Sequence, residues 1–313
     1  MNLPFICGIT FAPFAAAGHF SSDDAKQSLK FMKERTHANF VVFVPSGLQD
    51  TPQSEKIIYT SRATMTDDEL KKMISYAQEL GLFVALKPTV NCKNGTWRAH
   101  INFFDEDVPC EPKWGNWFDS YSDFQTHYAK ISRETGCIMH IAGCEMVMSE
   151  RRESQWRQII SDIRTEYKGL VSYNTDKYQE HNVTWWDCVD VISSSGYYPI
   201  HDWENQLNRI EAVVKKFEKP FFFAESGCMS VEGSKNVPND WSVRGQADPL
   251  GQAAWYESMF QFCLKRNWVG GFALWSWTDK LYPENSAAMR GDYELFGKPA
   301  EEVVRRYYTG IQS

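Results

Sequence analysis

Hydrophobic residues along the chain follow two alternating patterns. Short apolar runs, rich in β-branched and aromatic residues, predict strands at residues 6–14, 40–44, 82–86, 137–143, 170–173, 189–195, 220–224 and 269–275. Between them, apolar residues recur at helical spacing, most clearly over residues 66–81, 118–134, 154–167, 205–217 and 252–265. Strands that alternate with helices in this way are typical of a parallel sheet with crossover helices.

Eight such units predict an α/β fold, a single (β/α)8 TIM barrel that spans residues 1–313. The helical pattern is weakest in the fifth unit, around Trp185. The longest connections follow strands three, seven and eight, at residues 91–117, 226–248 and 278–297. The loops at the C-terminal strand ends of a barrel build its active site. We therefore expect these three loops to form the walls of a substrate cleft.

Composition narrows the class of partner. The 33 basic and 40 acidic residues give a net charge of −7, which disfavours nucleic acid, and no apolar run is long enough to predict a membrane span. The 12 Trp and 14 Tyr residues suit carbohydrate, because a flat aromatic face matches the C–H face of a pyranose.

Cysteine and histidine spacing bears on metals and on location. None of the eight cysteines forms a C-x-x-C pair and the seven histidines are scattered, so we expect no metal and no cofactor. The first residues do not resemble a secretory leader, which predicts reduced thiols and a cytoplasmic location unless a leader was removed. The oligomeric state stays open.

Two glutamates carry the candidate chemistry. Glu145 follows the apolar run 138–144, and Glu225 follows the run 220–224. Each acid lies at the C-terminal end of a predicted strand, and strands four and seven lie roughly opposite each other in a barrel. Two carboxyl groups that converge there suit glycosidic bond cleavage. The alternative for either residue is a helix N-cap or a solvated charge at the barrel rim.

Four local motifs carry a family resemblance over essentially the whole chain. They are Gly143-Cys144-Glu145-Met146, Gly196-Tyr197-Tyr198-Pro199, Ala224-Glu225-Ser226-Gly227 and Leu274-Trp275-Ser276-Trp277. With these motifs the chain resembles the clan A glycoside hydrolases, and within that clan the family 113 β-mannanases. The resemblance implies that Glu145 is the acid/base, that Glu225 is the nucleophile and that Tyr197 orients the nucleophile.

One position departs from the wider clan. Most clan A enzymes have Asn before the acid/base, where it binds the sugar 2-hydroxyl, but this chain has Cys144, a poor hydrogen-bond donor. This change makes sugars with an equatorial 2-hydroxyl less favoured as substrates. A mannoside, whose 2-hydroxyl is axial, remains compatible with Cys144.

Several further side chains are candidates for substrate binding, each with a structural alternative. The aromatic candidates could instead be core or rim residues, Lys87 could form a salt bridge inside the barrel, and Asn174 could cap a loop. The full set of substrate-binding candidates is Trp275, Trp277, Tyr198, Lys87, Asn174, Trp97, Trp114 and Cys144.

The leading hypothesis is a retaining glycoside hydrolase that cleaves β-1,4-mannosidic bonds in mannan or manno-oligosaccharides by double displacement. One alternative keeps the mechanism and changes the substrate to glucan or xylan. A second alternative is a non-catalytic carbohydrate-binding barrel. Whether cleavage is endo or exo depends on whether the long loops close one end of the cleft.

Overall fold

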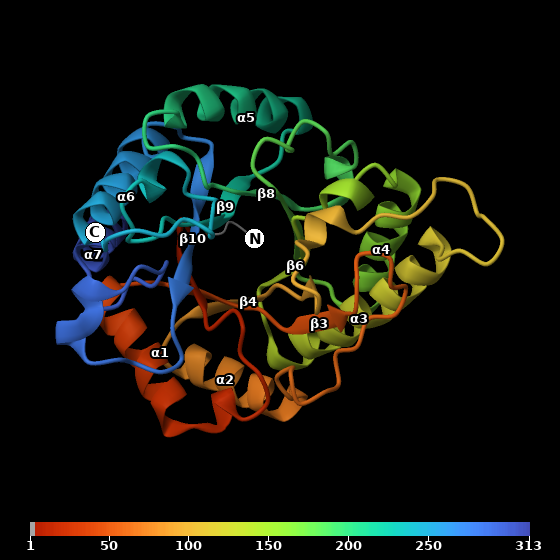
Figure 1. The fold of residues 1–313 in the computed structure, drawn as a ribbon, viewed down its shortest axis with the longest axis horizontal. Helices are drawn as coiled ribbons and strands as arrows, with labels where there is room; N and C mark the ends of the chain where they lie inside the picture. The colour runs from red at the N-terminus through yellow and green to blue at the C-terminus, as the bar shows by residue number, and fades with distance from the viewer. Residues whose placement is uncertain (1–3) are drawn as a thin grey trace.

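The computed structural model describes residues 4–313 and confirms the predicted TIM barrel, which Figure 1 views along its axis. Eight parallel strands close the barrel in the order β1-β10-β9-β8-β7-β6-β4-β2. These strands are β1 (Ile6–Phe11), β2 (Phe40–Phe43), β4 (Phe83–Leu86), β6 (Met139–Cys144), β7 (Leu170–Thr175), β8 (Val191–Ser195), β9 (Phe221–Ser226) and β10 (Val269–Trp277).

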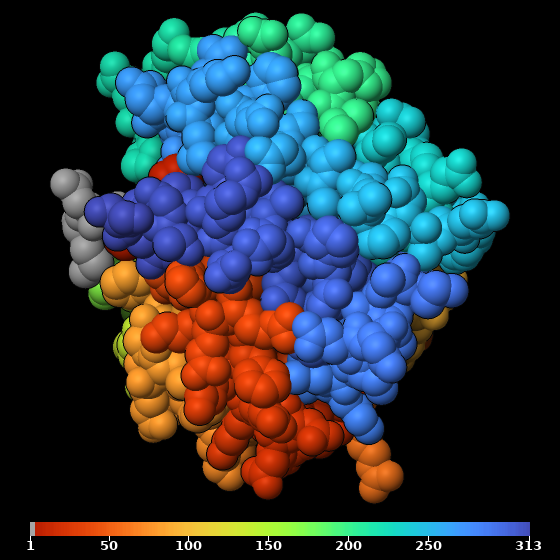
Figure 2. Space-filling view, turned by 90° about the vertical axis from the view of Figure 1, so that its left-hand side faces the viewer, coloured from red at the N-terminus to blue at the C-terminus, as the bar shows by residue number. Residues whose placement is uncertain are grey.

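The α-helices surround the barrel (Figure 1), and in Figure 2 the last of them, α7, lies at the surface between α1 and α6. Because α7 contacts both neighbours, it completes the outer ring where the two ends of the chain meet. The helices are α1 (Asp23–Thr36), α2 (Asp67–Glu79), α3 (Trp114–Thr135), α4 (Glu153–Glu166), α5 (Trp203–Phe217), α6 (Pro249–Cys263) and α7 (Pro299–Gln312).

The fifth unit differs from the prediction. A 3-10 helix, η4 (Trp186–Cys188), stands between β7 and β8 where we expected a weak α-helix, so residues 4–313 contain seven α-helices. The Trp185 ring stacks on Trp156 at 4.9 Å and 8° and is fully buried. The two indoles of residues 185 and 186 therefore cover this part of the barrel in place of a helix.

Side chains from the strands pack into two layers. One apolar cluster fills the barrel interior and includes Phe40, Val42, Met139 and Ala224. A larger cluster lies between the strands and the helices and includes Val41 and Phe223. Neighbouring residues on a strand point to opposite faces, which is why both layers draw on the same short runs. The strand ends are therefore packed on both sides.

The loop region at the C-terminal strand ends holds an unexpected small sheet. Strands β3 (Ser46–Gln49) and β5 (Thr89–Cys92) pair in parallel just beyond β2 and β4. The connection after the second barrel strand, residues 44–66, is therefore also long, in addition to the three that we predicted. Helix α3 begins at Trp114 instead of residue 118, which shortens the loop before it.

No helix within residues 4–313 is both long enough and apolar enough to cross a membrane.

Candidate active site

Local backbone geometry sets the position of Glu145. The residue follows β6 in the left-handed region, with φ 51°, and its N–H donates to the Asn174 carbonyl at 2.7 Å. Gly143 just before it has φ 118°, and a Cβ there would lie 2.1 Å from Tyr121 Oη. Only glycine fits that approach, so the Gly-Cys-Glu sequence creates the turn that directs Glu145 into the barrel mouth.

Glu225 lies within the last residues of β9 and is almost fully buried. Its Oε1 accepts hydrogen bonds from Lys87 Nζ at 2.5 Å and from the Cys144 thiol at 3.2 Å, while Oε2 accepts one from the Tyr197 hydroxyl at 3.0 Å. Burial alone would raise the pKa of Glu225. The charges of Lys87 and Arg98, together with these hydrogen bonds, outweigh burial and hold the pKa below its usual value. Glu225 is therefore ionised at neutral pH, as a nucleophile must be.

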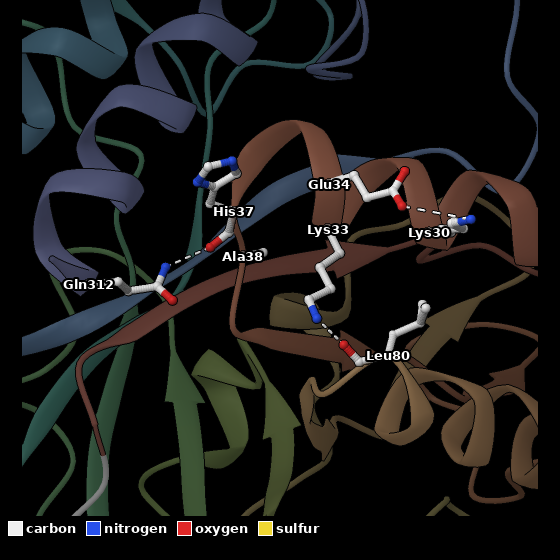
Figure 3. A pocket seen from close by; sticks show the side chains of 7 residues that line it. All are labelled: Lys30, Lys33, Glu34, His37, Ala38, Leu80 and Gln312. Atoms are coloured by element: carbon white, nitrogen blue, oxygen red, sulfur yellow. Dashed lines mark hydrogen bonds and ion pairs between the residues drawn. The ribbon is translucent and has the colours of Figure 1, made fainter.

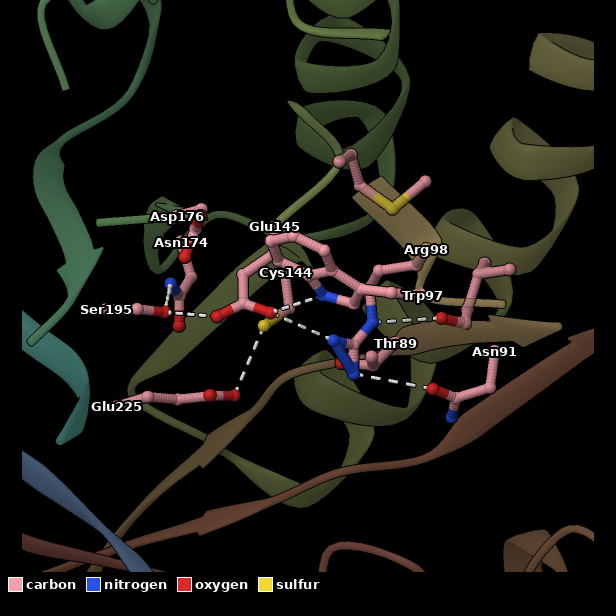
Figure 4. Close-up of polar contacts among 12 residues, drawn as sticks. Thr89, Asn91, Trp97, Arg98, Cys144, Glu145, Asn174, Asp176, Ser195 and Glu225 are labelled. Atoms are coloured by element: carbon pink, nitrogen blue, oxygen red, sulfur yellow. Dashed lines mark hydrogen bonds and ion pairs between the residues drawn. The ribbon is translucent and has the colours of Figure 1, made fainter. Parts of the chain in front are cut away.

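Glu145 accepts hydrogen bonds from three other donors. Ser195 Oγ contacts Oε1 at 2.7 Å, while Trp97 Nε1 at 3.0 Å and Arg98 Nη1 at 3.1 Å both contact Oε2 (Figure 4). The arginine comes from the 3-10 helix η2 (Arg98–His100) and the serine from the end of β8. Glu145 thus has its own cation, separate from the lysine that pairs with Glu225.

The two carboxylates meet across the barrel mouth, as the sequence predicts. One oxygen of Glu145, one oxygen of Glu225 and the Cys144 sulfur all lie within 4.8 Å of one another. That separation matches the short distance, about 5–5.5 Å, that retaining glycosidases use. The same three groups have a spacing that a metal could bridge, but Lys87 and Arg98 already place a positive charge beside each carboxyl group. The charges therefore fit a neutral substrate better than a cation.

A third carboxyl group, that of Asp176, lies beside Glu145 just after β7 (Figure 4). Burial and the charge of Glu145 raise the pKa of Asp176 to about 8, although Lys177 Nζ lies 3.5 Å away and opposes the shift. Burial and a charged Glu145 both favour the protonated form of Asp176, in which it can donate a hydrogen bond to the cleft.

The thiol of Cys144 contacts Glu225, although we expected it to lie against the substrate as a weak donor. Cys144 is fully buried, and burial and the charge of Glu225 raise its pKa well above the usual value. The group therefore stays a protonated thiol and donates its hydrogen bond to Glu225 Oε1.

Lys87 and Asn174 support the site from below. Lys87 is completely buried in its ion pair with Glu225, which confirms the salt bridge inside the barrel, one of our two readings, and its contact with substrate stays a prediction. Asn174 is also buried, and its amide donates to Ser195 Oγ at 3.0 Å and to the Thr175 carbonyl at 2.9 Å. These bonds connect strands β7 and β8 next to Glu145, and the contact of Asn174 with sugar stays a prediction.

Three aromatic predictions are wrong because the rings are buried. Trp114 packs on Phe103 at 4.9 Å within the first turn of α3 and has no open face for a sugar. Tyr198 is buried and donates to Glu180 Oε1 at 2.7 Å. Trp277 is buried and donates from Nε1 to Ser28 Oγ at 3.0 Å.

Strand register explains why Trp275 and Trp277, two residues apart in β10, do not both face the barrel mouth. Thr10 pairs with Trp275, whereas the next residue of β1, Phe11, pairs with Trp277. The extra residue in β10 breaks the two-residue period. Trp275 consequently stays half-buried at the barrel mouth, with Lys87 Nζ 5.6 Å from its ring centre, whereas Trp277 packs toward α1.

Sequence reasoning missed Arg98 and Ser195. Arg98 lies in a loop without periodicity, so no pattern singled it out. Ser195 had a usable signal, because the run Ser193–Ser195 places three hydroxyls at the end of a strand that is otherwise apolar. Polar residues in a buried strand need partners, and here the partner of Ser195 is Glu145.

A pocket lies far from these residues. It has a volume of about 420 Å³ and lies between α1 and the C-terminal end of α7, beside Leu80 (Figure 3). Its polar groups already have partners: Lys33 donates to the Leu80 carbonyl, and Gln312 Nε2 donates to the His37 carbonyl. Residues 37 and 80 precede strands β2 and β4, so this pocket is at the N-terminal end of the barrel, opposite the carboxylates.

Comparison with known proteins agrees with this geometry. The sequence profile of Glycoside Hydrolase Family 113 matches residues 9–298. A solved GH113 β-1,4-mannanase in a complex is 53% identical to the chain, with a TM-score of 0.97 over 98% of this chain and 99% of that one. The GH113 β-mannanase of Alicyclobacillus acidocaldarius, solved with ManMIm, is 42% identical, with a TM-score of 0.96 over 99% of each chain.

A more distant structure shares only the fold. The β-glucuronidase of Ruminococcus gnavus is 14% identical, with a TM-score of 0.66 over 98% of this chain and 50% of its own. None of the curated protein sequences compared with the chain matches it significantly.

Proposed function

Because this chain belongs to Glycoside Hydrolase Family 113, we propose that it hydrolyses β-1,4-mannosidic bonds in mannan or manno-oligosaccharides with retention of configuration. The observation that carries the proposal is the close approach of Glu145 and Glu225, within 4.8 Å, with a separate cation beside each. The β-mannanase structures at 42% and 53% identity support the choice of sugar.

In the first step, Glu225 attacks the anomeric carbon as the bond to the leaving oxygen breaks, and Glu145 gives that oxygen its proton. Glu225 loses its negative charge in the glycosyl ester while Glu145 gains one. Arg98, 3.1 Å from Glu145, stabilises the charge that appears there. The total charge of the two glutamates does not change, so this step requires no ion or proton to enter the buried site from solvent.

In the second step, Glu145 takes a proton from water as the water oxygen attacks the anomeric carbon from the opposite side. The ester bond breaks and Glu225 leaves as a carboxylate, which its three hydrogen-bond donors, Lys87, Cys144 and Tyr197, stabilise again. Two inversions give net retention. Lys87 and Tyr197 thus act as positioning residues for the nucleophile.

Substrate choice is tested with oligosaccharides of equal length. We expect turnover of mannohexaose to exceed that of cellohexaose and xylohexaose by at least about 100-fold, as expected when a sugar hydroxyl meets the wrong environment. Faster turnover of cellohexaose would identify glucan as the substrate, and faster turnover of xylohexaose would identify xylan.

A second experiment separates catalysis from mere binding. Glu225→Ala should abolish turnover of mannohexaose, and added azide should restore some activity and give a mannosyl azide of inverted configuration. A carbohydrate-binding barrel would show no turnover even in the unmodified protein. Lys33→Met, at the other end of the barrel, is the control and should keep full activity.

The cytoplasmic location expected from the sequence remains a prediction. Such a location would favour short manno-oligosaccharides over the polymer, because polymers do not enter the cytoplasm. Fractionation of the producing cells, with an antibody to the chain, tests it directly.

A further inference from the structure

Glu150 is a buried carboxyl group that the proposed mechanism does not use. It follows the 3-10 helix η3 (Val147–Ser149), shortly after Glu145 in the chain, and is 2% exposed. Its Oε1 accepts hydrogen bonds from the hydroxyls of Tyr173 and Thr175, each at 2.7 Å. Its Oε2 is buried and has no hydrogen-bond partner among residues 4–313. A carboxyl group costs stability in such a setting, and the contacts of its two donors show what it holds.

The Tyr173 hydroxyl connects Glu150 to the backbone of the acid/base. Its oxygen accepts a hydrogen bond from the Met146 N–H at 3.0 Å, and Met146 directly follows Glu145. A tyrosine hydroxyl has a single proton. Because Glu150 accepts the hydrogen bond from that proton, the oxygen lone pairs of the hydroxyl are left for the Met146 N–H. Glu150 therefore sets the orientation of the hydroxyl that holds the peptide after Glu145.

Thr175 makes a second connection, to the peptide before Glu145. Residues 173 and 175 share a face of β7, and Tyr173 belongs to the cluster between the strands and the helices. Between them lies Asn174, whose carbonyl accepts the Glu145 N–H at 2.7 Å. Glu150 thus fixes, from outside the barrel, both residues that flank this carbonyl.

The backbone at Glu145 needs such support. A residue other than glycine in the left-handed region, here with φ 51°, costs roughly 1–2 kcal/mol. Strained backbone of this kind persists only where the surrounding structure fixes it. The N–H groups of Glu145 and Met146 both bond to residues 173–175, which Glu150 holds in turn. If Glu150 stops accepting these hydrogen bonds, the turn can relax and the Glu145 carboxyl moves away from the leaving oxygen.

The aromatic residues that replace a fifth helix keep this support in place. Trp185 Nε1 donates to the Glu150 carbonyl at 3.0 Å. The Tyr173 ring centre lies 4.8 Å from that of Trp156 and 4.9 Å from that of Trp185. Glu150 and Tyr173 are therefore both held by the same indole.

The charge state of Glu150 identifies its closest replacement. Burial raises the pKa of Glu150 to about 8, although the hydrogen bonds from Tyr173 and Thr175 oppose the shift. Burial therefore favours the neutral acid, whose carbonyl oxygen can accept both hydrogen bonds. Glutamine is also neutral and keeps one acceptor oxygen, whereas methionine fills a similar volume without an oxygen.

We propose that Glu150 is a positioning residue for the acid/base, which acts through Tyr173 and Thr175 to hold the turn at Glu145. The inference rests on the proposed function and adds to it, because it makes proton transfer to the leaving oxygen depend on a residue outside the cleft.

Two aryl glycosides with the same sugar part test the inference. The phenyl group of phenyl β-mannobioside needs a proton from Glu145 to leave, whereas the dinitrophenyl group of 2,4-dinitrophenyl β-mannobioside leaves without one. Glu150→Met and Tyr173→Phe should each lower kcat/KM for release of phenol by about 10–100-fold, and that for release of dinitrophenol by less than about threefold. The ratio of the two values does not depend on the folded fraction, so a variant that is merely destabilised leaves it unchanged.

Two further variants complete the test. Glu150→Gln should keep the ratio within about threefold of the unmodified protein. Tyr167→Phe is the matched control, because it removes a 2.7 Å hydrogen bond from another buried tyrosine to the Cys137 carbonyl, just before the other end of β6. It should leave the ratio unchanged.

An unchanged ratio in Glu150→Met and Tyr173→Phe would overturn the inference, as would a ratio for Glu150→Gln as altered as that for Glu150→Met. If Glu150→Met does not fold, Tyr173→Phe decides between the two outcomes. Failure of the unmodified protein to cleave mannohexaose would instead refute the proposed function, so the two failures are distinguishable.

Discussion

Replacing Lys87 by Met tests how the site keeps its nucleophile charged. Lys87 Nζ lies 2.5 Å from Glu225 Oε1 and is fully buried, and Met keeps most of the volume of the side chain without its charge. At an effective dielectric constant of about 20, two charges at that distance attract by roughly 6–7 kcal/mol. This is a ceiling, because removing Lys87 also removes the cost of burying its own charge.

Observed shifts for a carboxylate beside one cation are smaller, about 1–3 pKa units, or about 1.4–4 kcal/mol. The direction is fixed by the structure. The pKa of Glu225 is below its usual value because the effects of Lys87 and Arg98 are larger than the opposing effect of burial. Removing Lys87 takes away part of the lowering effect, so the pKa of Glu225 should rise. Activity needs ionised Glu225 and is lost as pH falls through that pKa. In Lys87→Met, the acid limb should therefore move to higher pH.

The assay is the pH dependence of kcat/KM on mannohexaose, with Lys33→Met as the control at the other end of the barrel. We expect the acid limb of Lys87→Met to rise by about 1–3 units and the rate to recover partly at alkaline pH. An acid limb within about 0.3 units of the unmodified protein would refute the reasoning, because Lys87 would then contribute nothing to the charge state of Glu225.

Three further variants probe neighbouring contacts. Tyr197→Phe removes a 3.0 Å hydrogen bond to Glu225 and should lower kcat/KM by about 10–100-fold. The circular dichroism spectrum should stay unchanged. A loss below about twofold would mean that the hydroxyl does not position the nucleophile. Cys144→Ser replaces a thiol donor by a stronger hydroxyl donor and should move the acid limb of kcat/KM down by up to about one unit; an upward move would show that the hydroxyl does not donate to Glu225. Trp114→Ala should lower the free energy of unfolding in urea by about 3–5 kcal/mol without changing KM for mannohexaose. A raised KM would show that Trp114 contacts the substrate.

The sequence predicted the barrel and its two acids because both depend on local patterns. Each strand is a short apolar run, and the acids at residues 145 and 225 lie where two such runs end. Parallel topology then brings those ends to one rim whatever the loops do. The contact from Tyr197 to Glu225 followed from the family resemblance and is present in the structure.

The errors arose where long-range packing decides which way a side chain points. Trp114 was assigned to a loop because the start of α3 carries no side-chain cap that would reveal it. Trp277 faces the core because β10 holds one more residue than β1 at that point, and a strand's own sequence does not show its partner's register. Arg98 reaches Glu145 from a loop whose course is set by contacts distant in sequence, so no pattern could have located it.

Trapping the covalent intermediate tests the central claim most directly. A 2-deoxy-2-fluoro-β-mannosyl fluoride slows the second step, so the glycosyl ester accumulates on the nucleophile, and peptide mass spectrometry identifies the labelled residue. We predict one label, on Glu225, and β-configured initial products by NMR of unmodified substrate. A label on another residue, or α-configured initial products, would contradict the account.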